Sequence, residues 1–305
     1  MRLLIVGSNG LLGRHAAVYF KATEATVVCA SHRPGADLVL DLHAPIDEAI
    51  HAMPSGITHA LVCSGLTSLE ACCRHPEQTR AFNVMQTIAL LQALIQRGIQ
   101  PIFCSSDLVF RGDRGNYAED DSRDPTTEYG RQKKAVEDFL LSQRAPWMVI
   151  RLSKLYSLKP DDPSPIGQMW TALRAGSVVR CAEDQVICPT WVGDIPRALH
   201  LLMRQKAKGV YHVASPQRLT RYLLGLRVAE TLGVAHLVQR CSLRDFSFRE
   251  PRPSNNSLNV TKLLTDTGIR FAMLDEMFLQ IAARRGDASA VVFPRAPLCL
   301  AGGRA

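Results

Sequence analysis

The 305-residue chain has no apolar stretch that approaches the roughly 20 residues needed to cross a bilayer. Its apolar start, residues 3–6, is cut short by Gly7, so neither a membrane anchor nor a secretory signal is expected. Aromatic residues make up only 6%, and the 36 basic residues form no long run. Because nucleic-acid binders usually concentrate positive charge and interleave it with aromatic rings, we expect neither a nucleic acid nor a membrane as partner.

Metal-binding signatures are also missing. The nine cysteines include no Cys-x-x-Cys pair, and the nine histidines include no His-x-x-x-His pair. An odd number of cysteines, several inside apolar stretches, indicates reduced thiols rather than a disulfide framework. The sequence therefore predicts a cytoplasmic protein without a metal site.

What the chain does contain is an alternation of short apolar runs with longer amphipathic ones. Expected strands lie at 3–6, 26–30, 59–64, 101–106 and 147–152, and expected helices at 11–21, 47–53, 79–97, 129–143, 195–204 and 221–232. Strands that are apolar on both faces and alternate with helices predict an α/β fold with a parallel sheet covered on both sides.

A glycine-rich turn follows the first expected strand. It reads Gly7-Ser8-Asn9-Gly10-Leu11-Leu12-Gly13 and runs into the first helix. In this pattern the first glycine allows a tight turn, the second a close backbone approach to a pyrophosphate, and the third close packing of helix on sheet. The free N–H groups of the helix start then face the phosphates. The alternative is a glycine-rich turn without a ligand.

The end of the second expected strand bears on the choice of cofactor. An NAD site usually has an acid there, whereas this chain has Ser31 and Arg33 with no acid between them. A hydroxyl and a guanidinium suit a 2′-phosphate, which predicts NADP(H) in preference to NAD(H), unless Arg33 is only a surface residue. Asp41, followed by Leu42, is either a partner for the adenine amine or a loop acid.

Tyr129 and Lys133 are four residues apart in an expected helix, so both lie on one face. A nearby ammonium favours the phenolate, so we expect Lys133 to lower the pKa of Tyr129. Ser106 ends an expected strand upstream, at the edge where parallel α/β sheets bind ligands, and could donate to a carbonyl oxygen. Asp107 follows it, either as a substrate contact or as a loop cap.

With these features the chain resembles the extended short-chain dehydrogenase/reductases, and among them the dTDP-4-dehydrorhamnose reductase-like branch. The resemblance covers residues 1–265 in collinear order. Its further motifs are Asn83, Ser105-Ser106-Asp107-Leu108-Val109-Phe110-Arg111-Gly112, Tyr117-Ala118-Glu119, Arg151-Leu152-Ser153, and residues 189–195, 209–214 and 252–258.

The resemblance implies a Rossmann doubly wound parallel sheet with a smaller C-terminal substrate-binding α/β domain. The NADP-binding Rossmann domain would span 1–150 and be completed by 190–213. The substrate-binding domain would span 151–189 and 214–290. Residues 291–305 have little periodicity, and we expect a flexible tail there.

The resemblance also implies roles for single residues. Tyr129 would protonate the substrate oxygen, Lys133 would tune Tyr129 and hold the nicotinamide ribose, and Ser106 would polarise the carbonyl. Further cofactor contacts would be Ser64, Gly65 and Asn83, and further substrate contacts Thr67 and Arg252.

Two residues depart from the pattern of this branch: Leu108 stands where a tyrosine is usual, and Lys154 where a tryptophan packs on the sugar. An ammonium in place of an aromatic platform changes sugar recognition. The sequence thus predicts an NADPH-dependent reductase of a keto-sugar nucleotide, with the sugar unidentified. The alternatives are a sugar-nucleotide epimerase or dehydratase and a non-catalytic regulatory subunit. A homodimer is compatible with the sequence.

Overall fold

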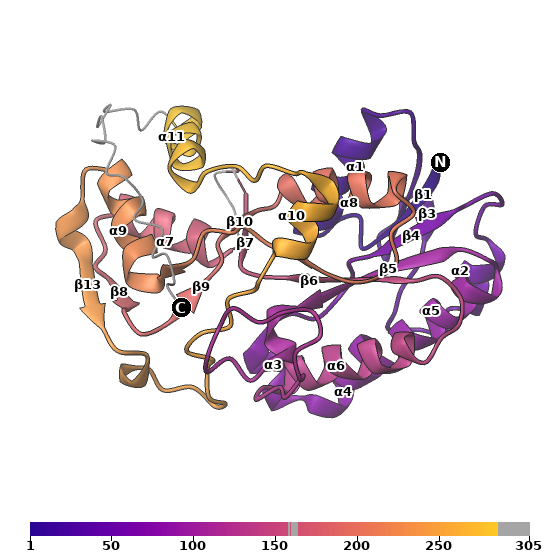
Figure 1. Cartoon of the computed structure of the whole chain (residues 1–305), viewed down its shortest axis with the longest axis horizontal. Coiled ribbons are helices and arrows are strands. Elements are labelled where there is room, and N and C mark those ends of the chain that lie inside the picture. Colours follow the sequence, from indigo (N-terminus) through magenta and orange to yellow (C-terminus); the bar gives the residue numbers. More distant parts are fainter. Residues whose placement is uncertain (158, 160–163, 286–305) are drawn as a thin grey trace.

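The fold was analysed in a computed structural model that describes residues 1–157, 159 and 164–285. A seven-stranded parallel sheet forms its centre, in the order β11-β6-β5-β4-β1-β2-β3 (Figure 1). Its strands are β1 (Arg2–Val6), β2 (Thr26–Ser31), β3 (Leu38–Val39), β4 (His59–Val62), β5 (Gln100–Ser106), β6 (Met148–Leu152) and β11 (Gly209–Val213). This confirms the predicted doubly wound parallel sheet. The predicted tail, 291–305, lies outside the described residues.

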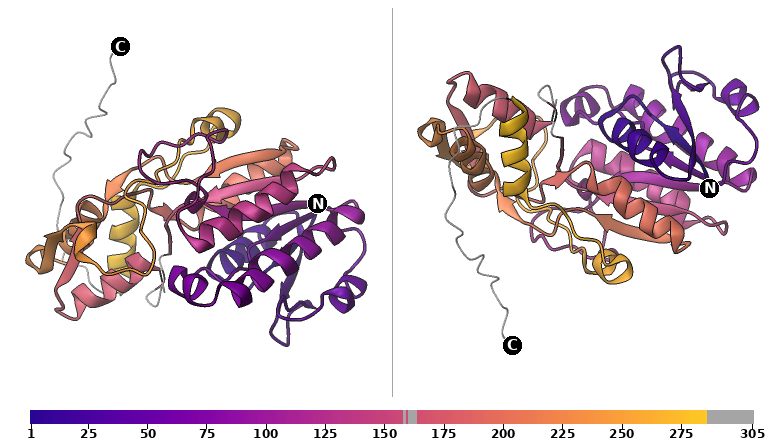
Figure 2. Two further views of the ribbon diagram at one scale, coloured as in Figure 1. Left: turned by 90° about the horizontal axis from the view of Figure 1, so that it is seen from below. Right: turned by 90° about the horizontal axis from the view of Figure 1, so that it is seen from above.

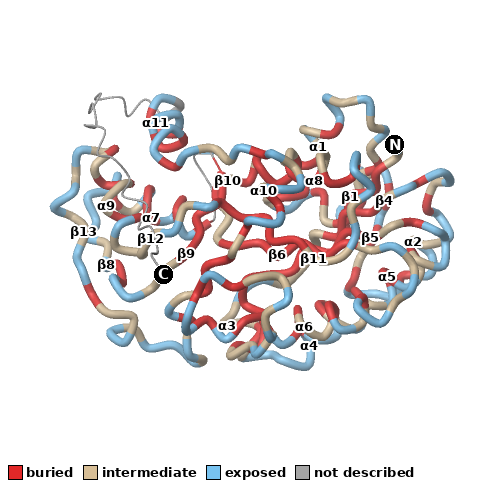
Figure 3. The backbone as a smooth tube through the Cα atoms, viewed as in Figure 1, coloured by how far each residue is buried: buried red, intermediate tan, exposed pale blue. Residues whose placement is uncertain are grey.

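The alternation of side chains along β1 divides the core between the two faces of the sheet. Leu3 and Ile5 pack with α1 (Leu11–Lys21) and α8 (Asp194–Arg204), and Leu4 and Val6 with the helices of the other face. That other face carries α2 (Asp47–His51), α5 (Thr87–Gln96) and α6 (Glu128–Leu141). Because helices cover both faces of the sheet, side chains on both faces of its central strands are buried, which explains the near-continuous apolar runs of the sequence. Figure 3 shows the central strands buried along their length.

The helix expected at 79–97 is interrupted. The structure has α4 (Pro76–Arg80), a π-helical turn at Ala81–Gln86, and then α5. Before them lies α3 (Leu69–Arg74), which the sequence analysis did not predict and whose first turn is capped by the Ser68 hydroxyl. The pattern of apolar residues continues through the π turn, so periodicity alone did not reveal the break.

A smaller part of the chain, a group of helices and short strands, lies next to the central sheet, at one end of the long axis of the molecule (Figure 2). Its helices are α7 (Pro165–Arg174), α9 (Arg221–Thr231) and α11 (Leu274–Arg285). Its strands pair two by two: β7 (Leu155–Tyr156) with β10 (Thr190–Trp191), β8 (Val179–Ala182) with β13 (Val238–Cys241), and β9 (Val186–Ile187) with β12 (Leu219–Thr220). A separate apolar core around Trp170 and Phe278 holds it together.

One segment differs from the predicted division of the chain. Helix α10 (Thr261–Thr267) falls within the predicted substrate-binding range but packs on the sheet, where Leu263 joins the core formed by α1 and α8. After it has formed most of the smaller part, the chain thus returns to the part that contains the central sheet. Among the described residues, no helix combines the length and the apolar character that a membrane crossing requires.

Candidate active site

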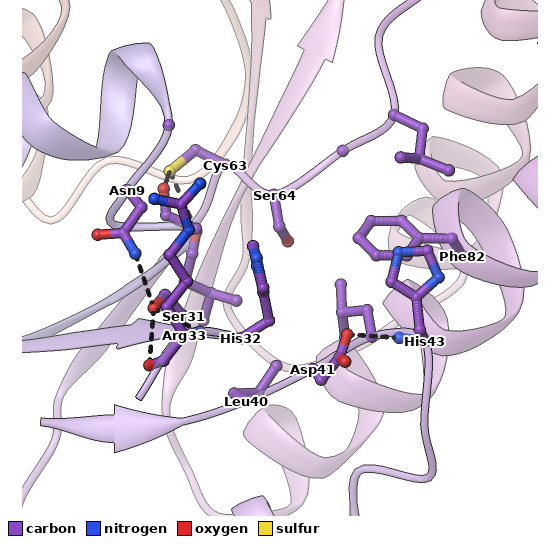
Figure 4. Close-up of a pocket in the computed structure, with 16 residues that line it drawn as sticks. Asn9, Ser31, His32, Arg33, Leu40, Asp41, His43, Cys63, Ser64 and Phe82 are labelled. Atoms are coloured by element: carbon purple, nitrogen blue, oxygen red, sulfur yellow. Dashed lines mark hydrogen bonds between the residues drawn. The ribbon is translucent and has the colours of Figure 1, made fainter. Parts of the chain in front are cut away.

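A pocket of about 340 Å³ lies at the carboxyl ends of β1, β2 and β4 (Figure 4). The strand order reverses at β1, and α/β sheets bind their ligands at such a switch point. Of the residues predicted to hold the cofactor, the pocket brings together Gly7, Asn9, Gly10, Ser31, Arg33, Asp41, Leu42, Ser64 and Gly65. His32, His43 and Phe82 also line it, and the His43 and Phe82 rings lie 4.6 Å apart.

Two glycines of the turn are needed for steric reasons. Gly7 has a φ of +84°, and a Cβ placed on it would lie 2.7 Å from the Ser64 backbone nitrogen. A Cβ on Gly13 would lie 2.2 Å from the Gly7 carbonyl oxygen. The turn therefore packs against the end of β4 on one side and α1 on the other, and no side chain fits at either place.

The end of β2 is organised by the Ser31 hydroxyl. It accepts hydrogen bonds from Asn9 Nδ2 at 3.0 Å and from the Arg33 backbone N–H at 3.1 Å. Figure 4 shows the side chains of His32 and Arg33 on the pocket side. Asp41 is the one carboxylate that lines the pocket in the described part of the chain, and its Oδ1 accepts from the His43 backbone N–H at 2.9 Å.

Ser64 supplies an independent sign that a polar ligand belongs here. Its Oγ is buried in the pocket wall and has no hydrogen-bond partner among the described residues. A buried hydroxyl without a partner is costly, and a bound polar group would satisfy it. Together with the side-chain-free turn at Gly7, this hydroxyl makes the pocket suitable for a nucleotide.

Four predicted cofactor residues lie behind the pocket rather than on its wall. Leu11 begins α1, Leu12 is buried in the core below it, Gly13 packs against the Gly7 carbonyl, and Asn83 is in the π-helical turn. Asn83 holds the segment after β4: its Oδ1 accepts from Leu66 N–H at 2.8 Å, and its Nδ2 donates to Leu66 O and to Gln132 Oε1. It thereby joins that segment to α6.

Helix α6 carries Tyr129 and Lys133 on one buried face, after the Thr127 hydroxyl caps its first turn. The Lys133 ammonium donates to the Cys104 carbonyl at 2.8 Å and lies 5.6 Å from the centre of the Tyr129 ring. It also borders the pocket, since a Cβ on Gly65 would lie 3.7 Å from Lys133 Nζ. The predicted lysine therefore lies next to the Gly65 side of the pocket, with Tyr129 beside it.

The expected effect of Lys133 on Tyr129 is wrong for this structure. Burial, and next the Asp107 carboxylate, raise the pKa of the Tyr129 phenol well above its ordinary value. Burial lowers the pKa of Lys133 to about 8. The Lys133 ammonium is directed to the Cys104 carbonyl, and burial is the largest cause of the raised pKa of the phenol.

Ser106 ends β5 as predicted and is buried beside Asp107. Its hydroxyl donates to Asp107 Oδ1 at 2.9 Å, while Asp107 Oδ2 accepts from the Ser153 hydroxyl, also at 2.9 Å. Asp107 thus links the ends of β5 and β6, a contact that the sequence analysis did not predict. Burial raises the pKa of this carboxyl.

A buried ion pair also holds the ends of β5 and β6 against α6. Glu137 of α6 is fully buried and accepts from Arg151 of β6, with 2.8 Å between Oε2 and Nη2. The same carboxylate accepts from the Ser105 hydroxyl and from Arg123. This network fixes α6 against β5 and β6, and so fixes Tyr129 relative to Ser106.

The predicted substrate residues Lys154 and Arg252 form a cationic group with Arg221, which the sequence analysis did not single out. The guanidinium groups of Arg221 and Arg252 lie close enough to Lys154 to lower the pKa of its ammonium, after burial, the largest cause. Arg252 Nη1 is buried and has no partner among the described residues. Thr67, the remaining predicted contact, is exposed beside Gly65.

Glu250 is a further residue that sequence reasoning missed. Its Oε1 accepts from the backbone N–H of Glu128, at the start of α6, and from Arg131 Nη2, at 2.8 and 2.9 Å. These bonds anchor the segment that carries Arg252 to Glu128, the residue before Tyr129. No sequence signal could have shown this contact, because 122 residues separate Glu250 from Glu128.

Comparison with known proteins finds relatives in sequence and solved structures with the same fold. A protein named "Probable low-salt glycan biosynthesis reductase Agl14", from Haloferax volcanii, is 27% identical over 95% of this chain and 100% of its own length. The solved dTDP-4-dehydrorhamnose reductase of Clostridium acetobutylicum has a TM-score of 0.83 at 21% identity, covering 94% of this chain and 100% of that one. The Bacillus anthracis dTDP-4-dehydrorhamnose reductase, solved in complex with NADP, has a TM-score of 0.82 at 19% identity, with 93% and 99% covered.

The family model described as the RmlD substrate binding domain matches residues 1–283, nearly all of the described chain. The predicted branch, the predicted fold and the predicted class of NAD(P)-dependent oxidoreductase are thereby confirmed. On this match, the chain belongs to the RmlD substrate-binding domain family.

Proposed function

We propose that this protein is an NADPH-dependent reductase of a keto-sugar nucleotide, with Tyr129 as the proton donor. One observation carries the proposal. The Lys133 ammonium borders both Gly65, in the wall of the nucleotide pocket, and the Tyr129 ring, 5.6 Å away. The proposed cofactor site and the proposed acid–base pair, Tyr129 and Lys133, therefore lie at the same edge of the sheet, next to Ser106.

When bound, NADPH would supply the hydride that reduces the keto carbon. Gly7, Gly10 and the start of α1 would face its phosphates, and Ser64 would satisfy a polar group of its nicotinamide half. Ser31 and Arg33 at the end of β2 favour a 2′-phosphate, since Arg33 can pair with it and no acid stands there.

The chain's own residues would then handle the developing negative charge on the substrate oxygen. The Tyr129 phenol carries a proton at neutral pH, as any phenol with an ordinary or raised pKa does, and can donate it to that oxygen. Lys133 stands behind it as a cation that can share the charge. Ser106 would add a hydrogen bond once its hydroxyl turns from Asp107 to the substrate.

The buried Tyr129–Lys133 pair and the pocket beside it favour this activity over a regulatory role of the same fold. The test is the oxidation of NADPH by the purified protein with dTDP-4-keto-6-deoxyglucose and related keto-sugar nucleotides. We expect turnover with the wild type, a loss of at least about 100-fold with Tyr129→Phe, and unchanged NADPH affinity in that variant. Full turnover by Tyr129→Phe would contradict the assignment. So would NADPH binding without consumption on every keto-sugar nucleotide tested.

A further inference from the structure

Lys154 has a cationic side chain that no described residue neutralises by direct contact. It follows Ser153, directly beyond the end of β6, where Leu152 is in register with Ser106 of β5. Its side chain is partly buried, and its backbone carbonyl accepts from Thr190 N–H at 2.8 Å. No hydrogen bond or ion pair joins its ammonium to another residue in the described part of the chain.

The neighbouring carboxylate is already engaged. Asp107 attracts Lys154, but its two oxygens accept from the hydroxyls of Ser106 and Ser153. Glu250, two residues before Arg252, is in an ion pair with Arg131 through its Oε1. A partly buried ammonium without an acceptor is unfavourable unless a ligand provides one.

Arg221 and Arg252 are the cations that act on Lys154. Their two guanidinium groups match the two charges of a sugar diphosphate, and Arg252, with its buried unpartnered Nη1, is suited to that group. Lys154 is the cation beside Asp107, whose carboxylate is bonded to Ser106 and Ser153.

We infer that the Lys154 ammonium binds an anionic substituent on the sugar ring, so that the substrate is a keto-sugar nucleotide whose sugar carries a carboxylate. This inference rests on the proposed function, because it assumes a sugar nucleotide in the cleft. It identifies Lys154 as a residue that determines specificity, and it separates this chain from reductases of uncharged deoxysugars.

The test compares two ligands that differ only in the charged group: UDP-glucose and UDP-glucuronic acid, together with the corresponding thymidine diphosphate pair. Calorimetric titration of the NADP⁺-loaded protein gives both dissociation constants. A charge-assisted hydrogen bond predicts a preference of about 10- to 100-fold for the acidic sugar. Lys154→Met should abolish that preference while leaving the affinity for the neutral sugar within about threefold.

Two variants serve as controls. Lys134→Met removes a lysine that is paired with Asp138 on the outside of α6 and should keep the preference. Arg252→Ala should weaken both sugars alike, because the diphosphate is common to both. Equal affinity for both sugars, or a preference that survives Lys154→Met, would overturn the inference and leave the proposed function standing. If neither sugar nucleotide binds while NADPH does, the proposed function fails and the inference falls with it.

Discussion

The Ser106 hydroxyl donates its hydrogen bond to Asp107 Oδ1, at 2.9 Å, so the group expected to polarise the substrate carbonyl is turned toward its own neighbour. The same oxygen of Ser106 accepts from the Leu108 backbone N–H at 3.2 Å. Substrate must therefore compete with a buried carboxylate for this proton. Asp107 is suited to yield it, because the Ser153 hydroxyl still satisfies its other oxygen.

Replacing Ser106 by alanine should lower kcat by about 100- to 1,000-fold, the usual cost of losing one donor to a developing oxyanion. The affinity for NADPH should stay unchanged, since Ser106 does not line the nucleotide pocket. Steady-state kinetics and a cofactor titration check both parts. A variant with normal kcat would show that the hydroxyl never leaves Asp107.

The pH dependence of the reaction should follow Lys133. Its folded-state pKa is lowered to about 8, so the ammonium is present below that pH and is lost as the pH rises through it. We expect kcat/KM for NADPH, which reports the free enzyme, to fall above pH 8 by about tenfold for each pH unit. Lys133→Arg keeps its charge and should show no such fall. A wild-type profile that is flat to about pH 10 would contradict the role of this ammonium.

Arg33→Ala should weaken NADPH binding by about 10- to 100-fold and change NADH binding by less than about twofold, because only the former carries a 2′-phosphate. Fluorescence titration with both cofactors measures the ratio. Arg97→Ala, an exposed arginine at the end of α5, is the matched control and should affect neither. An equal loss for both cofactors would remove the argument for NADPH.

The buried ion pair behind the site should be costly to break from one side. Glu137→Ala leaves Arg151 charged and buried, and we expect the free energy of unfolding to fall by about 3–5 kcal/mol. Lys134→Ala removes one partner of a surface pair on the same helix and should cost less than about 1 kcal/mol. Urea denaturation of the three proteins compares them, and similar midpoints would mean that the network adds nothing to stability.

The sequence predicted local elements well because their causes are local. Helix α1 begins after the glycine turn and ends at Lys21, as expected, and nine of the thirteen predicted cofactor residues line one pocket. The direction of the Ser106 hydrogen bond could not be predicted, since it depends on Ser153, 46 residues from Asp107. Nor could the raised pKa of Tyr129, which is set by burial under several elements.

The electrostatic grouping of Lys154 with Arg221 and Arg252 was beyond prediction for the same reason. These residues come from three segments that meet only after the smaller part of the chain has folded beside the sheet. A motif identifies residues that are close in the sequence, whereas the charge of a cleft is a property of the folded chain.

The π-helical turn at Ala81–Gln86 has a consequence for how this chain tolerates insertions and deletions. A π turn accommodates one residue more than an α turn, so the helical faces before and after it are out of phase by about 100°. Asn83 depends on this offset to reach Leu66 and Gln132 together. Deleting a single residue here would restore a regular helix, preserve its hydrophobic spacing on α5, and rotate the amide away from both partners. In this stretch the number of residues therefore matters as much as their identity.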